Sequence, residues 1–89
     1  LDASNADAHV EYGRVLYQLD RLRAAADQFE RALKLDGRNL TANYNLAMVY
    51  QYMDKRALAI ERFRYLLTLD LPGEWKAQAE GYVRRLEGQ

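Results

Sequence analysis

Residues 35–70 read LDGRNLTANYNLAMVYQYMDKRALAIERFRYLLTLD, a stretch that opens and closes with the dipeptide Leu-Asp. The same dipeptide stands at residues 1–2, so one unit of structure closes every 34 residues. A period of this length is typical of a repeated pair of helices. Small and apolar residues dominate the positions that recur: Asn5 with Asn39, Ala8 with Ala42, Val15 with Val49, Asp20 with Asp54, Ala25 with Ala59, Phe29 with Phe63 and Leu33 with Leu67.

The composition is that of one small globular domain. The 89 residues are 49% hydrophobic and 29% charged, which favours a folded core over disorder. Thirteen basic residues balance thirteen acidic ones, so we expect neither a nucleic-acid partner nor a basic membrane anchor. No apolar run approaches the ~18–20 residues that span a bilayer. The chain has no cysteine, which excludes a disulfide or a thiolate zinc site and leaves the compartment open.

The first two helices follow from the spacing of apolar residues. Between residues 6 and 19 these residues lie three and four positions apart, which predicts an amphipathic helix. Ser4, three residues before Asp7, has the form of an N-terminal cap. A second helix begins near Leu22 and ends at Asp36-Gly37, where glycine can adopt the left-handed conformation.

The same pattern continues to the end of the chain. Asn39 is the predicted cap of a third helix, Asp54-Lys55 separates it from a fourth, and Pro72-Gly73 ends the fourth. A fifth helix over 74–87 has one apolar and one polar face, which suits a terminal cap. No segment alternates apolar and polar residues as a strand does. The sequence therefore predicts an all-α fold of five helices.

The order of small, aromatic and apolar residues resembles the tetratricopeptide repeat, whose pattern is W-x₂-L-G-x₂-Y, then A-x₃-F, then P. The first unit reads His9-x₂-Tyr12-Gly13-x₂-Leu16 and Ala25-x₃-Phe29, with Gly37 in the proline position; the second reads Asn43-x₂-Leu46-Ala47-x₂-Tyr50 and Ala59-x₃-Phe63. The resemblance implies a right-handed superhelical stack of antiparallel helix pairs, an α-solenoid. His9 and Asn43 replace the tryptophan of the pattern.

The resemblance also divides the single domain, residues 1–89, into parts. Residues 6–39 and 40–73 are the expected repeats, and residues 74–89 the capping helix. Residues 1–5 look like the tail of a preceding repeat, so we expect the chain to be a piece of a longer array. Gly13 and Ala47, facing Ala25 and Ala59, would let paired helices approach closely. Phe29 and Phe63 would fill the space between units.

Catalysis and metal binding need convergent side chains, and few are present. His9 is the only histidine, and we expect it at the surface or the edge of a groove. The repeating aspartates at helix ends indicate capping and turns: Asp20, Asp36, Asp54 and Asp70. No glycine-rich phosphate loop occurs. We predict no enzyme activity, no metal and no cofactor.

By resemblance, the first helix of each pair lines a concave channel that in this family commonly holds a segment of another protein. The residues expected to bind a partner there are Val10, Arg14, Tyr17, Tyr44, Asn45, Met48, Tyr52 and Tyr82. Trp75 and Tyr82 could lie either in this channel or in the core. Tyrosine, methionine and arginine are enriched at interfaces. We therefore expect that replacing Tyr44 and Tyr52 by alanine leaves stability nearly unchanged and abolishes binding.

Two functions fit these residues. The first is a non-enzymatic scaffold or adaptor module that binds a peptide or protein segment in the groove. The alternative is a homodimer, or packing within an array, through the same aromatic surface. Family members that clamp a C-terminal carboxylate use lysines, asparagines and an arginine, and only Asn45 matches such a position. Val10, Arg14, Trp75 and Ala79 occupy the other places, so a hydrophobic or mixed peptide fits better.

Overall fold

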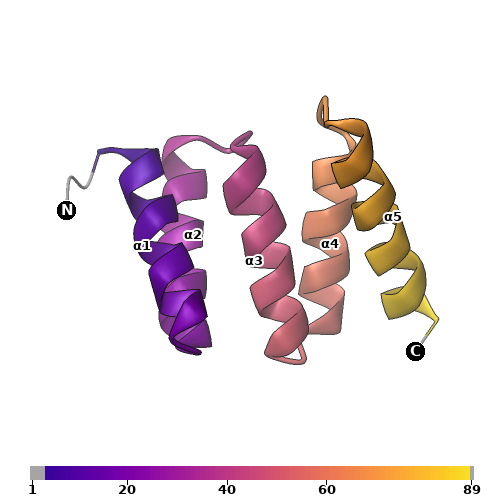
Figure 1. Ribbon diagram of the computed structural model, residues 1–89, viewed down its shortest axis with the longest axis horizontal. Helices are drawn as coiled ribbons and strands as arrows, with labels where there is room; N and C mark the ends of the chain where they lie inside the picture. The colour runs from indigo at the N-terminus through magenta and orange to yellow at the C-terminus, as the bar shows by residue number, and fades with distance from the viewer. Residues whose placement is uncertain (1–3, 89) are drawn as a thin grey trace.

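The computed structural model describes residues 4–88, all of whose regular elements are helices. The five helices are α1 (Ala6–Gln18), α2 (Leu22–Leu35), α3 (Leu40–Tyr52), α4 (Arg56–Leu67) and α5 (Gly73–Glu87). They follow one another side by side along the long axis of the molecule (Figure 1). The predicted all-α fold and its helix pairs are confirmed. Residues 1–3 of the expected preceding tail lie outside the described residues.

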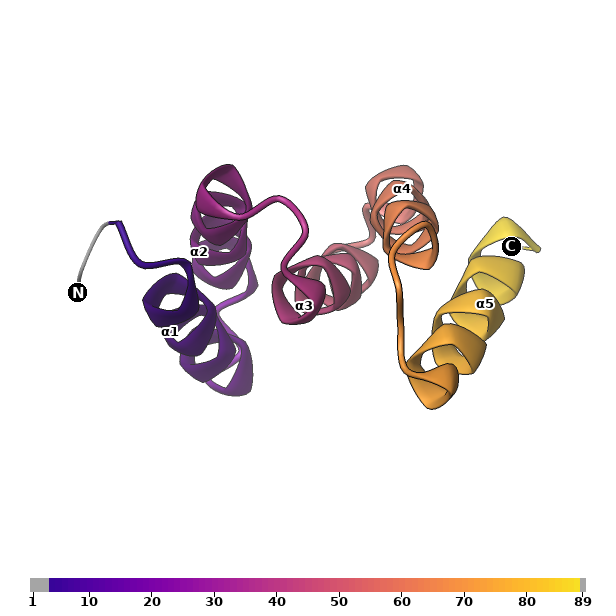
Figure 2. The ribbon, with the colours of Figure 1, turned by 90° about the horizontal axis from the view of Figure 1, so that it is seen from above.

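The helices form two layers. Seen from above, α1, α3 and α5 lie along one side and α2 and α4 along the other (Figure 2). Each helix packs mainly against its neighbours in the chain, and α1 also touches α3. The molecule measures 38 × 27 × 18 Å, so it is a slab rather than a sphere. The side formed by α1, α3 and α5 is called the first-helix face below.

Asparagine side chains cap the first helix of each pair. The Oδ1 atoms of Asn5 and Asn39 accept the backbone N–H groups of Ala8 at 3.2 Å and Ala42 at 2.9 Å. The predicted cap at Asn39 is confirmed, but Ser4 is not the cap of α1. Asn5 has the extended backbone of a capping residue, with φ −108°, and it directly precedes the first helical residue.

Aspartates make the turns within the pairs. Asp20 and Asp54 both have φ 60°, a left-handed conformation that aspartate adopts more readily than most residues. The predicted left-handed glycine at the end of α2 is wrong, since no glycine in residues 4–88 has a positive φ. There, the Oδ1 atom of Asp36 accepts the N–H of Arg38 at 3.3 Å. The turn role predicted for these three aspartates is confirmed.

Small residues permit close packing within each pair, as predicted. A Cβ atom at Gly13 would lie 2.8 Å from Cε1 of Phe29, so only glycine fits there without movement. Ala25, Ala47 and Ala59 are each 0% exposed. Phe29 and Phe63 are also fully buried. The core therefore runs through the stack as one continuous cluster.

Polar residues occupy the two positions where the family pattern has tryptophan. His9 is 3% exposed, and its Nδ1 lies 2.7 Å from Oε1 of Gln28 on α2. The expectation of a surface histidine is therefore wrong. Asn43 is 0% exposed, donates to the carbonyls of Gly37 and Asn39, and accepts from Arg62 at 3.0 Å. Such hydrogen bonds offset the cost of burying polar groups.

Candidate interaction surface

The predicted partner-binding residues do not all lie open on the first-helix face. Val10 was expected to bind a partner, but it is only 4% exposed and belongs to the core, so it offers little surface for a contact. Arg14 is exposed and pairs with Glu11 at 3.2 Å, an ion pair too open to stabilise the fold much. Asn45 donates its side-chain amide to the Thr41 carbonyl at 2.9 Å. Met48 is half-buried against the core.

Two tyrosines form an open pair where α1 meets α3. The ring centroids of Tyr17 and Tyr52 lie 6.1 Å apart, with the ring planes tilted by 47°. Tyr52 is 58% exposed, and it projects from the last turn of α3. Together with Asp20 and Leu22 the pair lines a hollow of about 400 Å³. These four residues are called the tyrosine pocket below.

Burial changes the acidity of the tyrosine pocket. Desolvation of Tyr17, reinforced by the neighbouring Tyr52 phenol, raises the pKa of Tyr17 to about 12. An uncharged phenol costs less to bury than a phenolate does. Tyr17 is therefore protonated throughout the physiological range, and it presents an uncharged aromatic ring with a hydroxyl group at its edge.

A closed aromatic cluster fills the space between α3 and α5. The Tyr44 ring lies 5.2 Å from that of Trp75 and 6.4 Å from that of Tyr82. Tyr82 stacks on the buried Phe63 at 5.1 Å and 10°, and Tyr44 meets the same ring edge-on at 6.0 Å. The Tyr44 hydroxyl also donates to Oε1 of Gln78 at 3.0 Å. These contacts join α3, α4 and α5, so the aromatic residues here hold the fold together.

The aromatic residues of the first-helix face thus divide into some that pack against the core and some that stay open to a partner. Trp75 and Tyr82 contact the core through the closed cluster, as one of the two interpretations proposed. Tyr44 is bound into that cluster as well, so its replacement by alanine removes packing contacts. These contacts argue against the expectation that replacing Tyr44 by alanine leaves stability nearly unchanged. Tyr52 keeps the exposure that a partner needs.

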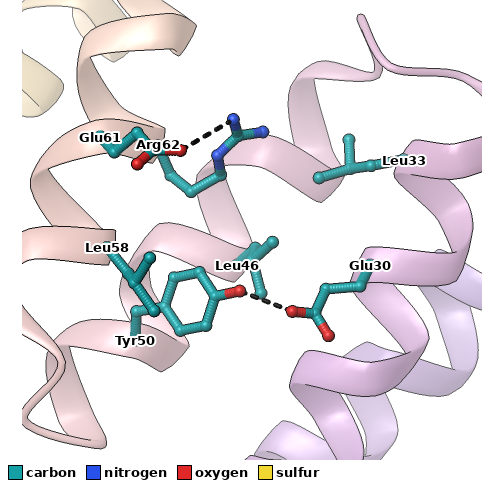
Figure 3. A pocket seen from close by; sticks show the side chains of 7 residues that line it. All are labelled: Glu30, Leu33, Leu46, Tyr50, Leu58, Glu61 and Arg62. Atoms are coloured by element: carbon teal, nitrogen blue, oxygen red, sulfur yellow. Dashed lines mark hydrogen bonds and ion pairs between the residues drawn. The ribbon is translucent and has the colours of Figure 1, made fainter.

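The opposite side of the slab carries a smaller hollow that the sequence did not reveal. It measures about 230 Å³ and is lined by Glu30, Leu33, Leu46, Tyr50, Leu58, Glu61 and Arg62 (Figure 3). The Tyr50 hydroxyl donates to Oε2 of Glu30 at 2.6 Å, which links α3 to α2. Burial, and then this acceptor, raise the pKa of Tyr50 above its ordinary value. The repeat pattern included Tyr50 but gave no sign of an acceptor on α2.

The polar groups in this hollow are already partnered within the chain. Arg62 lies 3.8 Å from Glu61 and donates to the Asn43 amide oxygen at 3.0 Å. The hollow is also smaller than the ~300–1,000 Å³ of most ligand pockets. It therefore serves as a hydrogen-bonded link between the helix pairs. Within residues 4–88, no group of three metal-binding side chains converges, and no helix has the length and apolarity to cross a membrane.

Comparison with known proteins agrees with this geometry. The sequence model of the tetratricopeptide repeat matches residues 6–39, which contain α1, α2 and the turn after them. Residues 6–39 therefore carry one tetratricopeptide repeat. No curated protein is similar enough to the chain to count as a match.

Two crystal structures of MamA share the fold of this chain. They superpose with TM-scores of 0.78 and 0.77 at 24% sequence identity, and each covers 99% of the chain. The chain in turn spans 60% and 56% of the length of those two proteins. At this identity the likeness supports the fold alone. The family is one of protein-interaction repeats that are typically not catalytic.

Proposed function

We propose that this tetratricopeptide repeat chain is a non-enzymatic scaffold or adaptor module that binds a peptide or protein segment on the first-helix face. The observation that carries the proposal is the open pair of Tyr17 and Tyr52 beside a hollow of about 400 Å³. Aromatic anchors beside a pocket are typical of binding hot spots. In this proposal residues 6–39 and 40–73 are the two repeats, and residues 74–89 cap them.

The chemistry of the face favours a segment with apolar or mixed side chains. A clamp for a C-terminal carboxylate needs several free cationic and amide donors. Here the Asn45 amide donates to its own helix, Arg14 pairs with Glu11, and Val10 is buried. Tyrosine and methionine side chains instead offer polarisable apolar contact area.

Selection of binders from a random peptide library displayed on phage tests the proposal. We expect selected peptides to bind with micromolar affinity, about −8 kcal/mol, because ordering a flexible peptide offsets much of the contact energy. Tyr52→Ala should weaken binding by about tenfold or more. Tyr65→Ala is the matched control, since Tyr65 lies on α4 in the other layer under the Arg62 guanidinium. Equal weakening by both variants would refute the proposed surface.

A second candidate function is self-association or packing within an array, and the outer face of α1 favours it. Tyr12, Val15 and Leu19 are 45%, 50% and 62% exposed on that helix. Val49 and Val83 recur at the position of Val15, but α2 and α4 pack against their helices, and they are only 0% and 9% exposed. In the described residues, no preceding helix packs on this side of α1, whereas α2 packs on α3 and α4 packs on α5.

Light scattering on a sizing column over a range of concentrations separates the two candidates. A dimer that Val15→Arg converts to a monomer, while Tyr52→Ala leaves it intact, would support self-association through α1. A dimer that only Tyr52→Ala disrupts would place self-association on the aromatic surface. A monomer at every concentration would exclude the homodimer and leave the first-helix face open for a partner.

A further inference from the structure

The tyrosine pocket combines two aromatic rings with one carboxylate. Tyr17 and Tyr52 supply the rings from α1 and α3, and Leu22 supplies an aliphatic wall from the start of α2. Asp20 stands in the turn between α1 and α2, where its backbone N–H donates to the Tyr17 carbonyl at 2.9 Å. Asp20, with its left-handed backbone, thus lines the pocket together with the two rings.

We propose that the tyrosine pocket binds the cationic side chain of a lysine or arginine within the partner segment. The inference rests on the proposed function and names the chemistry of one contact in it. The faces of aromatic rings carry partial negative charge, so they attract a cation placed over them. A carboxylate at the rim adds a full negative charge and accepts the N–H groups of the cation.

Other occupants fit the same pocket less well. Among the described residues that line it, Asp20 alone carries a charge, so an anionic side chain would be repelled. A purely apolar side chain would remove water from the carboxylate and return no hydrogen bond. The long methylene stem of lysine or arginine can pack on Leu22 and the rings while its charged end stays near Asp20. A cationic side chain with an apolar stem therefore suits both the apolar and the acidic residues that line the pocket.

The second repeat provides an internal control. Asp54 has the same φ of 60° as Asp20 and stands at the equivalent turn between α3 and α4. Asp54 does not line the tyrosine pocket. Replacing either aspartate by asparagine removes the charge and keeps a residue that tolerates the left-handed conformation. The pair of variants therefore separates loss of charge in the pocket from disturbance of a turn.

The test is an NMR titration of the isotope-labelled chain with Nα-acetyl-lysine methylamide. Nα-acetyl-norleucine methylamide serves as the neutral probe, because it has the same carbon chain without the amine. We expect the lysine probe to shift the signals of Tyr17, Asp20 and Tyr52, and to bind at least about fivefold more tightly than the norleucine probe. Asp20→Asn should remove that preference, and Asp54→Asn should leave it unchanged.

The outcomes distinguish this inference from the proposed function. Equal binding of both probes, or a preference that survives Asp20→Asn, would overturn the cation pocket even if selected peptides bind at Tyr52. A preference lost equally in both asparagine variants would also overturn it, because the effect would then come from the turns. A lysine preference that depends on Asp20 alone would support the pocket even if no peptide is selected on the face.

Discussion

The two ends of the first-helix face use the same residue type for different purposes. Where α3 meets α5, Tyr44 contacts Trp75 and Tyr82 and donates a hydrogen bond to Gln78. Where α1 meets α3, Tyr52 contacts one tyrosine ring and remains 58% exposed. The difference shows that an aromatic stripe on a repeat has no fixed role. The neighbouring helix decides whether each ring packs or stays available.

Two glycines at equivalent repeat positions, one on α1 and one on α5, also differ in their surroundings. Gly13 and Gly81 are two periods apart, with Ala47 between them. Gly13 faces the Phe29 ring of its partner helix, whereas a Cβ at Gly81 would meet nothing within 4 Å. In the described residues α5 has no partner helix on that side, so Gly81 has no packing role. The glycine of α5, the helix of the closed aromatic cluster, therefore has space for a side chain.

The largest expected effect belongs to the residue that anchors the closed cluster. Phe63→Ala should lower the free energy of unfolding by about 3–5 kcal/mol, because it removes a fully buried ring on which Tyr82 stacks. In so small a domain this loss can unfold most of the chain. Thermal and urea unfolding followed by circular dichroism measure it. A near-neutral Phe63→Ala would mean that the cluster does not hold α5 in place.

The two glycines should respond to alanine in opposite directions. Gly13→Ala should cost about 1–3 kcal/mol, because the new methyl group would overlap the Phe29 ring. Gly81→Ala should stabilise the chain by up to about 1 kcal/mol, because alanine favours a helix and meets no neighbour. Urea unfolding of the two variants gives both values. A destabilising Gly81→Ala would show that this face of α5 is covered in solution.

A smaller effect should appear at alkaline pH from the open end. The pKa of Tyr17 is about 12 in the fold and near 10 in an unfolded chain, so folding favours the protonated phenol. Its contribution to stability is complete below pH 10 and is lost as the pH rises from 10 through 12. Tyr17→Phe should therefore lose less stability over this window than the wild type.

Urea midpoints measured from pH 8 to the onset of alkaline unfolding check this prediction. Tyr65→Phe is the comparison variant, because it removes a phenol from α4, away from the tyrosine pocket. Identical slopes for Tyr17→Phe and the wild type would mean that Tyr17 is as hydrated in the fold as in the unfolded chain.

Local signals in the sequence were sufficient for the architecture. Periodic apolar residues placed all five helices, and Asn39, Asp20 and Asp54 marked a cap and two turns because such residues act on their own backbone. The expected positions of two side chains on α1 were wrong. His9 is buried with a hydrogen-bond partner, Gln28, on α2, and Val10 is buried although it was expected to face a partner.

The candidate site was predictable only as a set of aromatic residues on one side of the stack. Tyr44 and Tyr52 lie on the same helix, and the sequence pattern gives no reason to assign them different roles. Their difference comes from Trp75 and Gln78 on α5, which reach Tyr44. The tyrosine pocket likewise needs Asp20 and Tyr52, which are far apart in the chain. Such contacts require the packed fold.

The most direct test compares the free energies of unfolding of Tyr44→Ala and Tyr52→Ala, measured separately by urea titration. Tyr44→Ala should lose at least about 2 kcal/mol, because it removes several aromatic contacts and a hydrogen bond between α3 and α5. Tyr52→Ala should lose less than about 1 kcal/mol, as exposed positions generally do. Equal losses in the two variants would contradict the division of the face into a closed cluster and an open pocket.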